Sequence, residues 1–162
     1  MKKIKSFIAL LMLSFIFAAC GISSVGVSTT KNVSSSLTDI QNAVRETQTA
    51  FENKNSAETQ KGISKLIKLS EDSFYSESER LIARYCATYI NGGIMLDYII
   101  RNDKKWVETH DVATFDIFYG GIFKEVVNGN VTHIDTLKEY VGGLVNATSE
   151  IYFHYNELTG KQ

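Results

Sequence analysis

Apolar residues recur at intervals of three and four along most of the chain beyond residue 32. The longest regular stretch covers 134–158, where every third or fourth position carries a residue suited to burial: Ile134, Leu137, Val141, Leu144, Thr148, Ile151, Tyr155 and Leu158. Such spacing over three heptads is typical of a helix that packs along a bundle seam. We therefore predict a helix from about residue 132 to 158, with Thr132 and Asp135 able to cap its start.

The same spacing predicts two shorter helices near the start of the domain. The first covers 35–52, and Ser36 stands in a capping position at its beginning. The second begins at Asn55, a favourable N-cap residue, and ends near residue 70.

The segment 77–101 is apolar on nearly all sides of a helix, and Ser76 begins a capping box in front of it. A helix of this kind lies either in the centre of a bundle or in a membrane. Arg84, Asn91 and Asp97 interrupt the segment, and a charge near mid-bilayer costs about 2.5–3.5 kcal/mol. We therefore predict the central helix of a soluble bundle.

The segment 111–131 is compatible with two structures. Its apolar spacing predicts a helix over 111–128 that ends with Gly129 as its cap. Asn128-Gly129 between valine-rich flanks is also a strong hairpin signal. We favour the helix, because the 3-4 spacing continues and capping residues follow. The domain over 33–162 is thus predicted to be an all-α bundle of about five helices, with a small β-hairpin around Asn128-Gly129 as the minor alternative.

Residues 1–19 have the pattern of a secretory signal peptide. Lys2, Lys3 and Lys5 precede an apolar run from Phe7 to Ala19. This run spans about 20 Å as a helix, whereas the hydrocarbon core of a bilayer measures about 30 Å. A permanent transmembrane helix is therefore not expected, and a signal segment of this kind is not part of the folded domain.

The signal ends Phe17-Ala18-Ala19-Cys20, which resembles the lipobox of bacterial lipoproteins, with Phe17 where leucine is usual. The resemblance implies cleavage before Cys20 and lipidation of its thiol with diacylglycerol. Two or three acyl chains, at about 0.8 kcal/mol per buried methylene, hold a protein on a bilayer. Ordinary signal cleavage after Gly21 is the alternative.

Cleavage before Cys20 leaves 14 basic and 18 acidic side chains, because the signal contains three lysines and no acidic residue. Residues 20–32 are rich in Gly, Ser, Thr and Val and are predicted to form a flexible, lipidated tether. The residue after the lipidation site is Gly21. An Asp at this position typically retains lipoproteins in the inner membrane of Gram-negative cells. In such cells the resemblance therefore implies the outer membrane, and we favour its periplasmic side.

Composition excludes several functional classes. Seventeen basic and 18 acidic residues give no basic surplus for binding nucleic acid, and two cysteines are too few for a disulfide scaffold. No phosphate-binding loop, nucleophile elbow or zinc-protease motif is present. Cys86 lies in the apolar segment 77–101, where a thiol behaves as a small hydrophobe. We predict no catalytic residue and no cofactor.

The three histidines raise a metal hypothesis, which their spacing does not favour. His110 and His133 flank predicted loops, and His154 follows Glu150 by four residues. Helical di-iron sites use two Glu-x-x-His motifs instead. We expect surface histidines and no metal site.

Trp106 lies in the charged segment Arg-Asn-Asp-Lys-Lys-Trp, which we predict to be a loop. We expect it to be exposed and available for a contact, since tryptophan is enriched in binding hot spots.

Three glycine pairs lie inside predicted helices: Gly92-Gly93, Gly120-Gly121 and Gly142-Gly143. Each glycine inside a helix lowers the stability of that helix by about 1 kcal/mol relative to alanine, so another interaction must offset this loss. We favour close helix–helix approach. A break in the helix over 111–128 and a notch that receives a partner or ligand are the alternatives.

These observations favour a non-enzymatic, lipid-anchored envelope protein that binds another protein, as an accessory, assembly or exclusion factor. A surface-displayed lipoprotein that binds a host molecule is the second hypothesis. A bundle that binds a small ligand or a metal is the third.

Overall fold

The computed structural model describes residues 33–160, with side chains from residue 37 onward. The predicted signal peptide 1–19, the lipidation site Cys20 and the tether 20–32 lie outside the described residues. The described part consists of α2 (Val33–Glu52), α3 (Ser56–Glu71), α4 (Glu77–Asn102), α5 (Lys104–Thr109), α6 (Val112–Thr114), the π-helix η1 (Phe115–Tyr119), α7 (Gly120–Val127) and α8 (Ile134–Thr159). The prediction of an all-α bundle is confirmed.

Local capping defines where the central helix begins. The Glu79 backbone N–H donates to Ser76 Oγ over 3.3 Å, and the Ser76 backbone N–H donates to Glu79 Oε2 over 2.8 Å, which completes the predicted capping box. At the start of α3, the Glu58 N–H donates to the side chain of Asn55 over 3.2 Å. The N-cap of α8 is His133, so the predicted capping by Thr132 is wrong.

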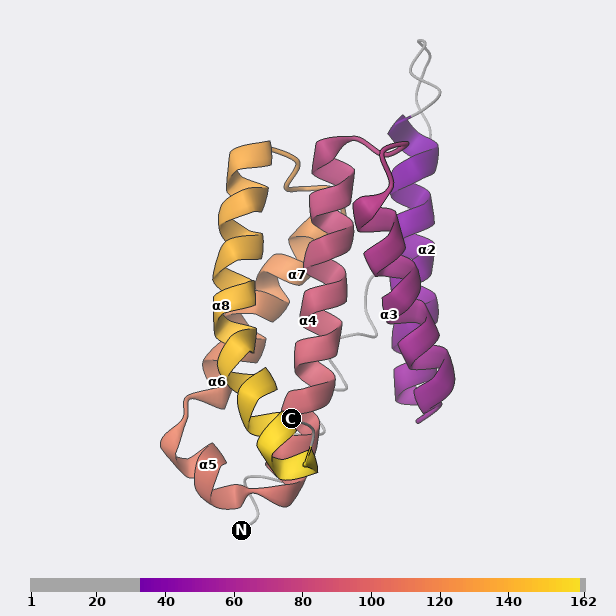
Figure 1. Ribbon diagram of the computed structural model, residues 1–162. Helices are drawn as coiled ribbons and strands as arrows, with labels where there is room; N and C mark the ends of the chain where they lie inside the picture. The colour runs from indigo at the N-terminus through magenta and orange to yellow at the C-terminus, as the bar shows by residue number, and fades with distance from the viewer. Residues whose placement is uncertain (1–32, 161–162) are drawn as a thin grey trace. The chain divides into compact units, whose positions relative to one another are not determined.

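The helix α4 is the centre of the bundle. It packs against α8 and against α3, which in turn packs against α2, and α7 also lies on α4 (Figure 1). Ile82, Tyr85, Cys86 and Ile99 are buried on its several sides. No helix in the described residues is both long and apolar enough to cross a membrane.

The predicted helix over 111–128 is present over 112–127, but it is not α-helical throughout, because the π-helix η1 lies between α6 and α7. A π turn contains one residue more than an α-helical turn, so its backbone hydrogen bonds join residues five apart and not four apart. The Tyr85 hydroxyl of α4 donates to the Tyr119 carbonyl over 2.9 Å, and the Tyr89 hydroxyl donates to Asp116 Oδ1 over 2.9 Å. Contacts from another helix therefore stabilise the π-helical segment, which continues into α7 at Gly120.

The hairpin alternative around Asn128-Gly129 is wrong. No strand occurs in residues 33–160, and Asn128 is the C-cap of α7. Gly129 has a φ of 74°, a left-handed conformation that glycine adopts without strain. It ends the helix, as the preferred interpretation predicted.

Candidate functional site

A groove of about 380 Å³ lies between α3 and α8, above one side of α4. Figure 1 shows α3 and α8 on opposite sides of α4. We call this cavity the α4 groove. Residues of α3, α4 and α8 line it: Ile63, Ile67, Ser70, Glu71, Arg84, Ala87, Thr88, Asn91, Met95, Val145, Thr148, Ser149 and Tyr152.

The floor of the α4 groove is one stripe of α4. Arg84, Thr88, Asn91 and Met95 are spaced by four, three and four residues, so they share one helix face. From residue 84 to residue 95 the helix rises about 16 Å, or three turns. The floor is therefore long enough to accommodate a short helical segment of another molecule.

Apolar side chains of the two walls remain partly in contact with solvent. Ile67 of α3 is 43% exposed, and Val145 and Tyr152 of α8 are 39% and 55% exposed. Apolar groups that are exposed together at a concave surface are typical of interaction sites.

The hydroxyl groups in the lining donate their hydrogens within their own helices. Ser70 Oγ donates to the Ile67 carbonyl over 2.6 Å, Thr88 Oγ1 to the Arg84 carbonyl over 2.9 Å, and Ser149 Oγ to the Val145 carbonyl over 2.8 Å. These groups can still accept hydrogen bonds from a bound molecule.

Four further polar side chains in the groove have no partner within the part of the chain that the structure describes. Glu71, Arg84, Asn91 and Tyr152 make no side-chain hydrogen bond or ion pair with any residue that the structure describes. A guanidinium group can bind a carboxylate through two parallel hydrogen bonds, and an amide can both donate and accept. The groove thus combines exposed apolar groups with unpaired polar groups of both charge signs.

Gly92 allows the α8 wall to lie close to α4. A Cβ atom at this position would come within 2.6 Å of Thr148 Cγ2 and 3.1 Å of Phe115 Cζ. Gly120 is similarly close to the neighbouring helix, because its Cβ would lie 2.7 Å from the Tyr89 hydroxyl. For these two positions, the expected close helix approach is present.

The other members of the glycine pairs do not fit that explanation. Gly93, Gly121 and Gly142 have no atom within 4 Å of an added Cβ, and Gly143 would make an ordinary contact of 3.7 Å with the Tyr119 hydroxyl. The expected close packing is therefore present at one member of each of the first two pairs, and it is wrong for Gly142-Gly143, where neither glycine faces another helix closely.

Gly62, which belongs to none of the glycine pairs, faces Thr47. A Cβ on Gly62 would clash with the Thr47 hydroxyl, so the close approach of α2 and α3 requires glycine there. Because Gly62 is a single glycine, the pattern of glycine pairs in the sequence does not indicate its role in packing.

Trp106 lies in α5, and the predicted loop is wrong. The Trp106 backbone N–H donates to Asp103 Oδ1 over 3.0 Å, so Asp103 caps α5 directly after α4 ends. The indole is half-buried and stacks between His110 and His154, with ring centroids 4.0 Å and 5.0 Å away. We call these three residues the imidazole–indole stack. Trp106 is thus an internal contact of the domain, and the expected free exposure is wrong.

The remaining candidate residues have simple surroundings. His133 is exposed, whereas His110 and His154 are half-buried in the stack, contrary to the expected surface positions. No group of three or more His, Cys, Asp or Glu in the described residues could hold a metal ion. Cys86 is buried completely, and burial raises the pKa of its thiol well above the usual range.

The chain matches no protein-family model, and no curated protein or solved structure is significantly similar to it. The interpretation of the α4 groove therefore depends on its own geometry and chemistry.

The sequence contains one signal for the groove. Arg84, Thr88 and Asn91 follow a 4-3 spacing inside an otherwise apolar segment, which indicates one polar stripe on the central helix. The two walls come from helices that are distant in sequence, and their position over this stripe depends on the tertiary packing.

Proposed function

We propose that this chain is a lipid-anchored envelope protein whose bundle binds another protein through the α4 groove, with a binding role and no catalytic one. The observation that carries the proposal is the set of four unpaired polar side chains among exposed apolar groups. Arginine and tyrosine are enriched among the residues that dominate protein interfaces. Arg84 and Tyr152 are the two groove residues of this kind.

The partner that fits best is an amphipathic helix of about three turns. Its apolar face would cover Ile67, Val145 and Tyr152, in the manner of other helix-in-groove complexes. A carboxylate on this helix would pair with Arg84 and so would fix its register. An amide or a cationic group would be suited to Glu71 at the rim.

The lipid anchor follows from the resemblance of residues 17–20 to a lipobox. Lipidation at Cys20 would hold the domain at a membrane surface, and the tether 20–32 would allow it to reach a neighbouring envelope protein. Gly21 after the lipidation site supports the outer membrane as the location in a Gram-negative cell, facing the periplasm.

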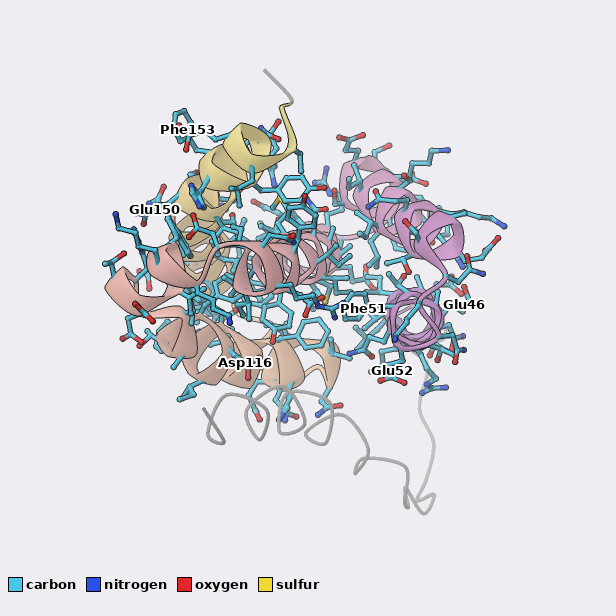
Figure 2. All side chains as sticks on the ribbon, turned by 90° about the horizontal axis from the view of Figure 1, so that it is seen from below. Glu46, Phe51, Glu52, Asp116, Glu150 and Phe153 are labelled. Carbon is cyan, nitrogen blue, oxygen red and sulfur yellow. The ribbon has the colours of Figure 1, made fainter. Side chains whose placement is uncertain are left out.

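Groove substitutions test this proposal by their effect on recovery of the partner. The affinity-tagged full chain is crosslinked in cells and purified from membranes, as wild type, Arg84→Ala and Tyr152→Ala. Arg45→Ala on α2 is one control. Phe153→Ala is the other, because Phe153 neighbours Tyr152 but is 66% exposed and points away from the bundle (Figure 2).

We expect the two groove variants to lose at least about tenfold of the recovered partner, because a central interface Arg or Tyr contributes about 2 kcal/mol. The control variants should recover as much partner as the wild type. Equal recovery by all variants, or an equal loss in the controls, would contradict binding in the groove.

A further inference from the structure

The imidazole–indole stack fastens α5 to α8 at one end of the bundle. None of the six residues of α5 is buried, so little apolar burial holds this helix in place. The Trp106–His154 stack and the ion pairs of His154 with Asp103 and of His110 with Glu150 link this region to α8. The stack of His110 on Trp106 lies within the α5 region itself. The attachment of α5 therefore depends on the chemistry of two imidazoles.

Both nitrogen atoms of His154 face carboxylates. Nε2 lies 3.1 Å from Asp103 Oδ2, and Nδ1 lies 3.3 Å from Glu157 Oε2. An ionised carboxylate only accepts hydrogen bonds, and a neutral imidazole carries only one N–H. Both bonds are therefore made only when the ring is protonated. The neutral ring would turn a nitrogen lone pair toward a carboxylate, at a side chain that is only 16% exposed.

The nitrogen atoms of His110 also face acceptors. Nε2 lies 3.1 Å from Glu150 Oε1, and Nδ1 lies 2.8 Å from the Trp106 carbonyl. The Thr109 hydroxyl, 3.0 Å from the same Nδ1, can either donate or accept. Protonation of His110 is therefore needed for its bonds to both the carboxylate and the carbonyl.

The two histidines are the cations that pair with the carboxylates around the stack. In the described part of the chain, Asp103, Glu150 and Glu157 form ion pairs with these two histidines and with no lysine or arginine. The pKa of Asp103 lies below its usual range, because the carboxylate accepts hydrogen bonds from the Trp106 backbone and from His154. The indole between the rings adds cation–π attraction when they are charged.

We propose that the imidazole–indole stack is a pH-responsive clasp, closed when His154 and His110 are protonated and opened when they lose their protons. The closed clasp holds α5 against α8. It opens as the pH rises and the two imidazoles lose their protons. This proposal is independent of the α4 groove, which uses neither histidine.

The chain contains a single tryptophan, so its fluorescence reports on Trp106 alone, and the third histidine, His133, is available as a control. Acrylamide quenching of Trp106 fluorescence is measured on the full chain at about pH 5.5 and about pH 8, on either side of the imidazole range. The variants are His154→Gln and, as the matched control, His133→Gln. His133 is exposed at the start of α8 and its side chain makes no capping bond.

We expect the quenching constant of the wild type and of His133→Gln at least to double at the higher pH. In His154→Gln it should be high at both pH values, while circular dichroism shows unchanged helix content. A wild-type quenching constant that does not change with pH would overturn the proposal without any variant. A pH response that survives in His154→Gln, or that disappears in His133→Gln, would overturn it as well.

Discussion

At the scale of single residues, the adjacent glycines Gly92 and Gly93 have opposite surroundings. Gly92 faces Thr148 of α8 and Phe115 of η1 so closely that a Cβ would clash, and Gly93 faces open space. Both carry the same cost in helix propensity, so the sequence could predict that some glycine is needed for packing but could not say which. The distinction arises only from the packing of α8 and η1 against α4.

We predict that Gly92→Ala destabilises the domain by about 1–3 kcal/mol, because Thr148 and the buried Phe115 ring must move to accommodate the methyl group. Gly93→Ala should instead stabilise it by up to about 1 kcal/mol, because alanine loses less backbone freedom on folding. Urea denaturation of the two variants and the wild type measures both effects. Changes of the same sign in both variants would contradict the contacts described for Gly92.

At the scale of elements, the regular spacing of apolar residues predicted α4 and α8 almost residue by residue. The capping box at Ser76 and the seam from Leu137 to Ile151 are local patterns, and the structure has both. The segment 104–119 was predicted less well. Its start, α5, depends on a cap from Asp103 and on stacking with His154, and η1 depends on hydroxyls of α4. The cap is a local feature, whereas the contacts with His154 and with α4 join residues that are distant in sequence and leave no periodic signal.

The hydroxyl of Tyr85 is predicted to hold η1 in its π-helical form. Burial raises the pKa of Tyr85 far above the usual range, so the phenol stays a donor to the Tyr119 carbonyl at all ordinary pH values. Tyr85→Phe leaves this carbonyl without that donor, which costs about 1–3 kcal/mol. Hydrogen exchange in 115–120 should accelerate more than in α8.

The matched control for this change is Tyr152→Phe, which removes a hydroxyl from a 55% exposed ring that has no hydrogen-bond partner in the described residues. Its exchange pattern should equal that of the wild type. Unchanged exchange in 115–120 of Tyr85→Phe would show that η1 does not depend on this bond.

At the scale of the whole molecule, the candidate site combines features that the sequence predicts to different degrees. The polar stripe of Arg84, Thr88 and Asn91 is visible in the sequence, and the lipobox-like residues end at Cys20. The groove itself requires α3 and α8 to lie on either side of that stripe, which no local pattern specifies. The sequence therefore suggested a binding protein without locating its binding surface.

We predict that Cys20→Ala releases the mature protein from membranes or leaves its signal peptide uncleaved. Cleavage before Cys20 would leave 14 basic and 18 acidic residues, a net charge of −4, and hence no basic surplus to hold the chain on anionic lipid. Membrane fractionation, together with incorporation of labelled palmitate, measures the outcome. Equal membrane retention of mature wild type and mature Cys20→Ala would contradict the anchor.

Photo-crosslinking in living cells tests the central claim, a protein partner bound in the α4 groove, most directly. A photoreactive amino acid is placed at Thr88 or Ser149 in the groove, and at Arg45 or Phe153 outside it. We predict one discrete protein adduct from both groove positions, none from the outside positions, and loss of the adduct when Arg84→Glu is added. No adduct from the groove, or the same adduct from all four positions, would contradict the account.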